Sequence, residues 1–136
     1  MLADKEITER IIGAAIQVHK TLGPGFLEAI YEEALAAEFD HLRIRYQRQK
    51  TVPIGYRGRS IGEHRLDFLV EDKVIVQLKA VLNLEDIHFA IVRSHLKATR
   101  LQSALLLNFA AVPLAVKRVG REETGSAQSS AVFSLS

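Results

Sequence analysis

The chain contains no cysteine. This absence excludes disulfide bonds, thiolate zinc sites and a cysteine nucleophile, and it is compatible with a reducing cytoplasm. The sequence also lacks any apolar run near the roughly 18 residues that a membrane span requires. Its N-terminus, MLADKEITER, has no signal-peptide core. We therefore expect a soluble, cytoplasmic protein.

Several enzyme motifs are missing as well. The sequence has no G-x-S-x-G elbow, no P-loop, no Rossmann glycine fingerprint and no H-E-x-x-H. Its five histidines are scattered, without the spacing of metal ligands. These absences disfavour a kinase, a dehydrogenase and a hydrolase of the G-x-S-x-G type.

The chain does contain enough apolar sequence for one folded domain. It has 136 residues, about half of them apolar, and we expect one domain over 1–120 and a flexible tail over 121–136. Periodicity and turn signals predict helices over 5–20, 26–39 and 85–100. They predict strands over 44–49, 52–56, 64–70, 74–81, 103–109 and 112–119, with 57–60 as a turn. The order, two helices, three or four strands, a helix and a strand, predicts an α/β (α+β) fold in which helices flank a central mixed sheet.

One predicted hairpin carries polar residues on otherwise apolar strands. Residues 67–79 read DFLVEDKVIVQLK. If the turn is 71–73, Val70 pairs with Val74 and Asp67 lies opposite Gln77, with Lys79 one step along the same face. A slip of one residue would mismatch the apolar faces, so this register is favoured.

Two interpretations of these polar residues stay open, because burying them unpaired would cost roughly 2–7 kcal/mol each. In the first, Asp67 and Lys79 form a structural ion pair and Gln77 is hydrogen-bonded beside it. In the second, Asp67 and another oxygen ligand hold a divalent cation, and Lys79 orients the attacking water and stabilises phosphoryl charge. Strand alternation also puts Leu66 and Phe68 together on the face opposite Asp67.

Positive charge is concentrated in one segment, although the net charge of the chain is only +2. Residues 41–62 contain no acid and six basic residues: Arg43, Arg45, Arg48, Lys50, Arg57 and Arg59. Such a segment can attract phosphate backbones, or it can be a solvated pair of strands.

Two motifs in this chain resemble a known family. An aspartate on one strand followed by x-x-Lys on the next occurs as Asp67 and then QLK at 77–79. The segment VHKTLGPGFLEAIY at 18–31 contains Gly25-x-x-Glu28-x-x-Tyr31. Together they resemble the GxxExxY family of small proteins in the PD-(D/E)XK nuclease superfamily, from about residue 7 to 109.

The resemblance implies a metal-dependent nuclease that cleaves phosphodiester bonds with Mg²⁺ or Mn²⁺. It implies Glu28, Asp67 and Gln77 as metal ligands, with Lys79 completing the catalytic set. It also implies nucleic acid as the partner, DNA in preference to RNA, and it admits a homodimer that would cut two strands. Without the motif, Glu28 would be an ordinary exposed helical glutamate, and Tyr31 is expected to be a core residue.

Three positions depart from the family pattern. Gln77 replaces the usual glutamate, which should weaken metal binding; Ile91 and His95 stand where related proteins carry Gln-x-x-x-Tyr; and Phe89 replaces a polar residue. A weakened nuclease and an inactive nuclease-fold domain that binds nucleic acid or a protein therefore both remain open. The expected nucleic-acid contacts are Arg43, Arg45, Arg48, Lys50, Arg93, His95 and Lys97.

Overall fold

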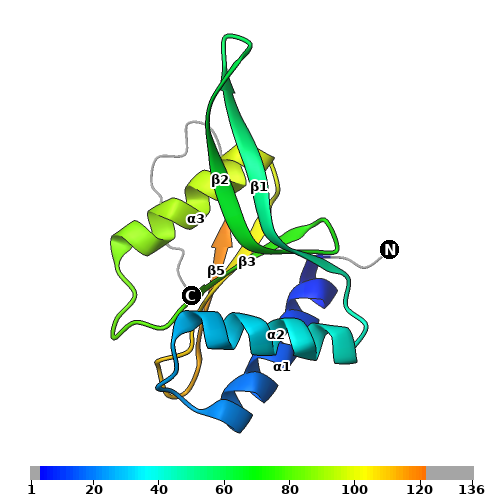
Figure 1. The fold of residues 1–136 in the computed structure, drawn as a ribbon, viewed down its shortest axis with the longest axis vertical. Coiled ribbons are helices and arrows are strands. Elements are labelled where there is room, and N and C mark those ends of the chain that lie inside the picture. Colours follow the sequence, from blue (N-terminus) through cyan, green and yellow to red (C-terminus); the bar gives the residue numbers. More distant parts are fainter. Residues whose placement is uncertain (1–3, 122–136) are drawn as a thin grey trace.

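The computed structural model describes residues 4–121, which form three helices and a five-stranded sheet (Figure 1). The elements are α1 (Asp4–Leu22), α2 (Glu28–His41), β1 (Tyr46–Tyr56), β2 (Arg59–Val70), β3 (Val74–Lys79), α3 (Asp86–Thr99), β4 (Ser103–Asn108) and β5 (Ala115–Gly120). The strands lie in sequence order, β1-β2-β3-β4-β5. Only β3 and β4 run parallel, and α3 makes the crossover between them. The expected mixed sheet flanked by helices is confirmed.

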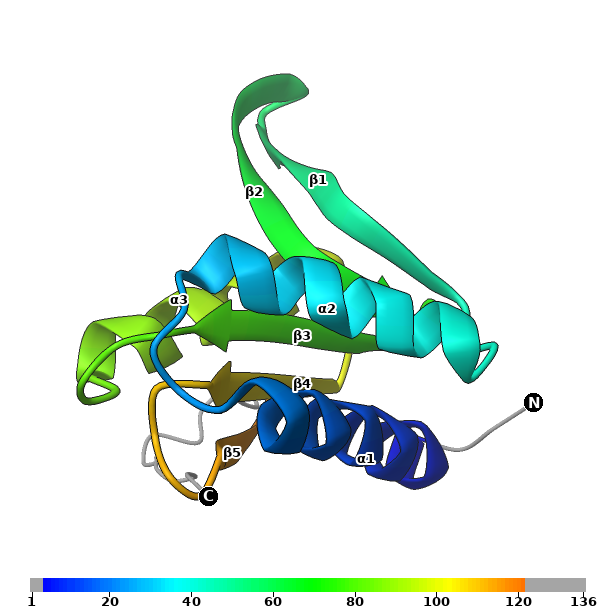
Figure 2. The ribbon, with the colours of Figure 1, turned by 60° about the horizontal axis from the view of Figure 1, so that its bottom comes forward.

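The sheet separates two hydrophobic clusters. Helices α1 and α2 cover one face, where Ile11, Leu35 and Phe39 pack on Phe68 and Val76 (Figure 2). On the other face, α3 packs against the sheet through a smaller cluster, which consists of Leu66, Ile75, Val92, Leu96, Ala104, Leu106 and Val119. The central strand β3 is apolar on both faces because helices cover both of them.

Tyr31 fixes the loop between α1 and α2. Gly23 and Gly25 have positive φ angles of 68° and 116°, which ends α1 and turns the chain. The Tyr31 hydroxyl donates to the Gly23 carbonyl at 2.6 Å and accepts from the Phe26 N–H at 3.1 Å. Its ring is fully buried and stacks on Phe109. Tyr31 is therefore a core residue, as expected, and it holds the start of α2 in place.

The two strands predicted over 44–49 and 52–56 are one strand, and this prediction was wrong. β1 continues through Pro53, which an edge strand tolerates because its N–H side needs no partner. The predicted turn over 57–60 is also too long. Arg57 and Gly58 both have positive φ, 51° and 76°, and make a two-residue turn, so β2 begins at Arg59.

The remaining boundaries differ by a few residues. β3 ends at Lys79 rather than at 81, and the last strand begins at Ala115 rather than at 112. The tail expected over 121–136 lies outside the described residues, except for Arg121. Within residues 4–121, no helix is long and apolar enough to cross a membrane.

Candidate active site

The hairpin of β2 and β3 has the predicted register, and it opens at Asp67. Val70 pairs with Val74, and the ladder ends at Phe68 and Val76. One step further, side chains take the place of backbone partners. The Asp67 N–H donates to Gln77 Oε1 at 2.7 Å, and the Leu78 N–H donates to Asp67 Oδ2 at 2.9 Å. Strand β2 therefore leaves β3 at this point, and Asp67 lies in the opening.

Strand β1 bends at the same level. Gln49 lies between the pairs Arg48–Phe68 and Lys50–Leu66, and its φ of 50° is left-handed, which is uncommon for a residue with a side chain. The bend overturns one expectation: Leu66 and Phe68 do not share a face. Phe68 packs under α1 and α2, whereas Leu66 packs on the α3 side. The hairpin twists between these two residues, so strict alternation fails there.

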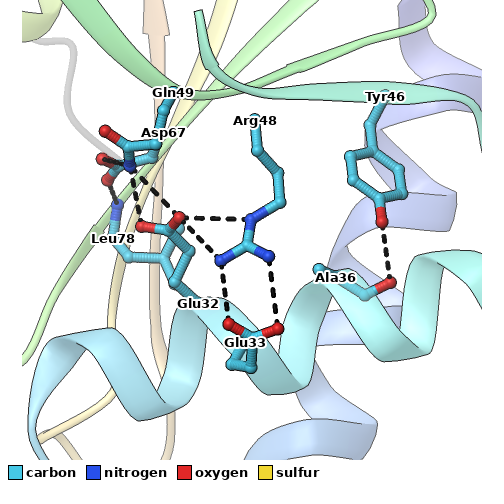
Figure 3. Close-up of polar contacts among 8 residues, drawn as sticks. All are labelled: Glu32, Glu33, Ala36, Tyr46, Arg48, Gln49, Asp67 and Leu78. Carbon is cyan, nitrogen blue, oxygen red and sulfur yellow. Dashed lines mark hydrogen bonds and ion pairs between the residues drawn. The ribbon is translucent and has the colours of Figure 1, made fainter.

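Helix α2 brings carboxylates to this opening (Figure 3). The Glu32 carboxylate accepts from Arg48 at 3.1 Å and from Gln49 Nε2 at 3.0 Å, and its side chain is only 13% exposed. Gln49 Nε2 also lies 3.5 Å from Asp67 Oδ1, so it bridges the two acids. Arg48 pairs with Glu33 as well, but Glu33 is 75% exposed.

The environment raises the pKa of Asp67 to about 6. Burial is the largest cause, because it disfavours the charged form. The carboxylates of Glu32 and Glu28 raise the pKa further, while the Leu78 N–H and the charge of Lys79 lower it. An excess of negative charge at a buried carboxylate is typical of functional sites, and a bound cation would relieve it.

Comparison with protein families assigns the chain to a superfamily. The family model of the PD-(D/E)XK nuclease superfamily matches residues 5–119. The chain belongs to the PD-(D/E)XK nuclease superfamily. Comparison with curated proteins and comparison with solved structures found no match. The match is to the superfamily, so membership of the GxxExxY family stays a prediction.

Asp67 and Lys79 do not form the structural ion pair that the first interpretation of the sequence expected. Among residues 4–121, no salt bridge joins Asp67 and Lys79, although Lys79 lies close enough to lower the pKa of Asp67. Gln77 is hydrogen-bonded beside Asp67, as that interpretation expected. Glu28 is the first residue of α2, half-buried, and close enough to raise the pKa of Asp67. The structure thus brings Asp67, Gln77, Lys79 and Glu28 into one region.

Sequence reasoning missed two residues of this region, Glu32 and Gln49. Glu32 could have been found, because it follows Glu28 by four residues and so shares its helix face. That face also carries the buried residues Tyr31 and Leu35. Nothing in the sequence marks Gln49, whose position depends on the bend of β1.

The candidate ligands at this site are carboxylate and amide oxygens, which are the atoms that a hard cation such as Mg²⁺ prefers. Asp67 Oδ1 has only the long contact to Gln49, so it is available as a ligand. Gln77 Oε1 is already used by the Asp67 N–H. Within the described part of the chain, no three His, Cys, Asp or Glu side chains are arranged to hold a metal ion. The carboxylates fit the group, and Gln77 Oε1 keeps a second lone pair after accepting from the Asp67 N–H, so its part as a ligand stays a prediction.

The residues expected to contact nucleic acid have different surroundings. Arg45 is paired with Glu71, and Arg48 is paired with two glutamates of α2. His95 is only 3% exposed and its ring contacts His64. Arg43, Lys50 and Lys97 are exposed, and Arg93 is half-buried. Of the seven, His95 and Arg48 are the least available to a phosphate.

Proposed function

We propose that this protein is a metal-dependent nuclease that hydrolyses phosphodiester bonds. The observation that carries the proposal is Asp67, a half-buried carboxylate fixed by a backbone N–H, crowded by two α2 carboxylates and faced by a lysine. Membership of the superfamily supports the same activity. DNA is the proposed substrate, and Mg²⁺ or Mn²⁺ the proposed cofactor.

Each residue has a distinct part in this proposal. Asp67 and Glu28, together with Glu32, would hold the cation once their side chains move closer, because among the described residues no three such side chains are already arranged for it. When bound, a divalent cation activates water and neutralises charge on the phosphate. Lys79 orients the attacking water and stabilises the negative charge that develops on the phosphoryl oxygens. Gln77 is a positioning residue, since its amide oxygen accepts from the backbone N–H of Asp67 and fixes strand β2 at this point, while the Leu78 N–H holds the carboxylate itself.

Gln49 bridges Glu32 and Asp67 through its side-chain amide. Its amide N–H group contacts both carboxylates, and such a donor offsets part of their repulsion. Binding of a cation to these acids therefore requires Gln49 to release them. Loss of the amide in Gln49→Ala should change the apparent metal affinity and leave the ligands intact.

The test is cleavage of labelled duplex and single-stranded DNA by the purified full chain across Mg²⁺ and Mn²⁺ concentrations. We expect Asp67→Ala and Lys79→Ala to lose cleavage by at least about a hundredfold. Glu32→Gln should lower activity, while its neighbour Glu33→Gln, on the exposed side of α2, should not. Cleavage that survives Asp67→Ala at the wild-type rate overturns the proposal.

A second candidate function rests on Gln77. A glutamine amide carries no charge, so the site lacks the negative charge of the usual glutamate at this position. The amide oxygen also already accepts from the Asp67 N–H. The chain would then be a nuclease-fold domain that binds nucleic acid, or a protein partner, without cutting. Calorimetry with Mn²⁺ separates the two: metal binding by Gln77→Glu but not by wild type favours the inactive domain, and binding by wild type that Asp67→Ala abolishes favours the nuclease.

A homodimer is part of the nuclease proposal, because one such site cuts one strand. Sedimentation of the full chain with and without duplex DNA tests it. A monomer under both conditions that still makes double-strand breaks in a single encounter contradicts the dimer.

A further inference from the structure

The outer half of the β1–β2 hairpin stands free of the rest of the sheet. Strands β1 and β2 pair from Tyr46–Val70 out to Tyr56–Arg59, but β2 pairs with β3 only over residues 68–70. Residues 50–65, here called the distal ribbon, therefore form a two-stranded ribbon that projects from the body (Figures 1 and 2). Most of its residues are exposed.

The base of the distal ribbon is fixed to α3. Val52 packs against the α3 cluster. His64 Nε2 is hydrogen-bonded to Ser94 Oγ at 2.7 Å, and the His64 ring meets the His95 ring edge-on at 4.6 Å. These contacts hold the direction in which the ribbon projects, so a partner bound at its tip has a defined position relative to Asp67.

The distal ribbon has a larger net positive charge than the whole chain. It contains four cations, Lys50, Arg57, Arg59 and Arg65, and one carboxylate, Glu63, for a net charge of +3. The whole chain has a net charge of +2, so the remainder is slightly negative. Among the described residues, none of the four cations takes part in a salt bridge. Helix α2, on the other side of the site, has five acids and no lysine or arginine.

The tip presents an arginine stacked on an exposed tyrosine. Arg57 lies over the Tyr56 ring, 5.6 Å from its centroid, and its Nε donates to the Tyr56 hydroxyl at 3.2 Å. This stacking fixes the guanidinium and covers one face of the ring. Arg59 follows directly after the two-residue turn, on the opposite strand from Tyr56.

We propose that the distal ribbon is an arm that binds duplex DNA in the major groove, at a distance from the phosphate that the proposed nuclease would cleave at Asp67. This inference rests on the proposed function and specifies its substrate as a B-form duplex. A two-stranded β-ribbon fits the major groove, which is about 12 Å wide. From Asp67 to Arg59 the strand rises at most about 26 Å at roughly 3.3 Å per residue. At about 3.4 Å per base pair, the arm reaches about eight base pairs from the site.

Other nucleic acids fit this arm less well. Single strands are bound by several aromatic side chains on which bases stack, whereas Tyr56 is the only Phe, Trp or Tyr of the distal ribbon and carries Arg57 over one face of its ring. The major groove of A-form RNA is too deep and narrow for side chains to read. The acidic helix α2 repels phosphates, so the duplex must approach from the side of the arm.

The test measures binding of the full chain, without a cleaving metal, by fluorescence anisotropy. The ligands are a 20-base-pair DNA duplex, a 6-base-pair hairpin stem, a 20-nucleotide single strand and a 20-base-pair RNA duplex. The variant is Arg57→Glu/Arg59→Glu. The matched control, Lys5→Glu/Arg121→Glu, makes the same change of net charge at exposed positions outside the arm.

We expect the arm variant to bind the long DNA duplex at least about tenfold more weakly, with a salt-dependence slope lower by about 2. Its affinity for the 6-base-pair stem and the single strand should match that of wild type, and so should its melting temperature. The control should bind like wild type. Equal binding of the long duplex by wild type and the arm variant overturns the inference, as does an equal loss on the single strand.

This outcome is separate from that of the nuclease proposal. If no variant or metal supports cleavage but the arm variant loses duplex binding, the arm stands and the cutting reaction fails. If Asp67→Ala abolishes cleavage but the arm variant binds like wild type, the nuclease stands and the arm fails.

Discussion

The two halves of the β1–β2 hairpin are built from similar residues and have opposite surroundings. In the proximal half, which comprises residues 45–49 and 66–70, Arg45 and Arg48 are paired with glutamates, and Tyr46 donates to Asp40 at 2.8 Å. In the distal half, Arg57, Arg59 and Arg65 have no acidic partner in the described structure. The comparison teaches that a run of basic residues divides into structural and available cations only after folding. Its boundary is the level of Gln49 and Asp67, where the candidate site lies.

The largest expected effect is on the free energy of unfolding, because the proximal half is packed in the core and the distal half is not. Phe68 is fully buried and its ring meets those of Phe39 and Tyr46 within 5.6 Å. Phe68→Ala should therefore lower the free energy of unfolding by about 3–5 kcal/mol. Ile61→Ala in the distal ribbon, where Ile61 is 63% exposed, should change it by less than about 0.5 kcal/mol. Urea denaturation measures both, and similar costs would remove the distinction between the halves.

The next effect concerns the two kinds of arginine. Arg48→Ala leaves the largely buried Glu32 without its cation, so it should cost about 1–3 kcal/mol of stability. Arg59→Ala removes no side-chain hydrogen bond or salt bridge within residues 4–121 and should be neutral to within about 0.5 kcal/mol. In DNA binding the order should reverse, with Arg59→Ala the more damaging. Denaturation and anisotropy on the same two proteins check both orders, and a stability loss in Arg59→Ala as large as that in Arg48→Ala contradicts the assignment.

A smaller effect is expected at the boundary residue. Gln49 holds a left-handed backbone and contacts Glu32 and Asp67. Gln49→Ala loses the contacts and keeps the strain, whereas Gln49→Gly loses the contacts and relieves it. Gln49→Gly should thus be more stable than Gln49→Ala by about 1 kcal/mol. The same pair at Thr51, in ordinary strand, serves as the control, and there alanine should be the more stable variant.

The smallest expected effect is a pH dependence at the base of the distal ribbon. Burial, and then the charge of His64, lower the pKa of His95 from 6.5 to about 4. Between these values the unfolded chain binds more protons, so the contribution of His95 to stability is lost as the pH falls from 6.5 toward 4. Asp67, whose pKa is raised to about 6, acts in the opposite direction over much of this range. The difference between wild type and His95→Phe isolates the histidine.

Melting temperatures of both proteins from pH 7 to pH 4 measure this difference. Relative to His95→Phe, wild type should lose stability progressively on acidification. Parallel curves would show that the ring titrates as in the unfolded chain.

The sequence predicted much of this architecture, for reasons that particular residues show. The alternation in 67–79 was sufficient to place Val70 against Val74, because any slip would expose apolar side chains. The Gly-Pro-Gly break was sufficient to separate α1 from α2. The strand boundaries around 49–52 were missed, because polar and exposed ribbon residues carry no hydrophobic period.

The candidate site was predictable only in part. Strand alternation gave the relative positions of Asp67, Gln77 and Lys79, whereas Glu28 was expected only because of the family resemblance. Glu32 was within reach of helical periodicity, because it follows Glu28 by four residues. Gln49 was not, since its contacts depend on a left-handed residue that the sequence does not mark. The use of Gln77 as an acceptor for the Asp67 N–H also depends on where β2 leaves β3.

The sequence by itself determined the order of elements, the register of the central hairpin and the proximity of Asp67, Gln77 and Lys79. These follow from local periodicity and from the cost of exposing apolar faces or burying polar ones. Only the tertiary structure decided which arginines are paired, that α2 brings Glu32 to Asp67, and that the distal ribbon projects freely. Those outcomes depend on contacts between segments distant in sequence, where charge and shape act through space rather than along the chain.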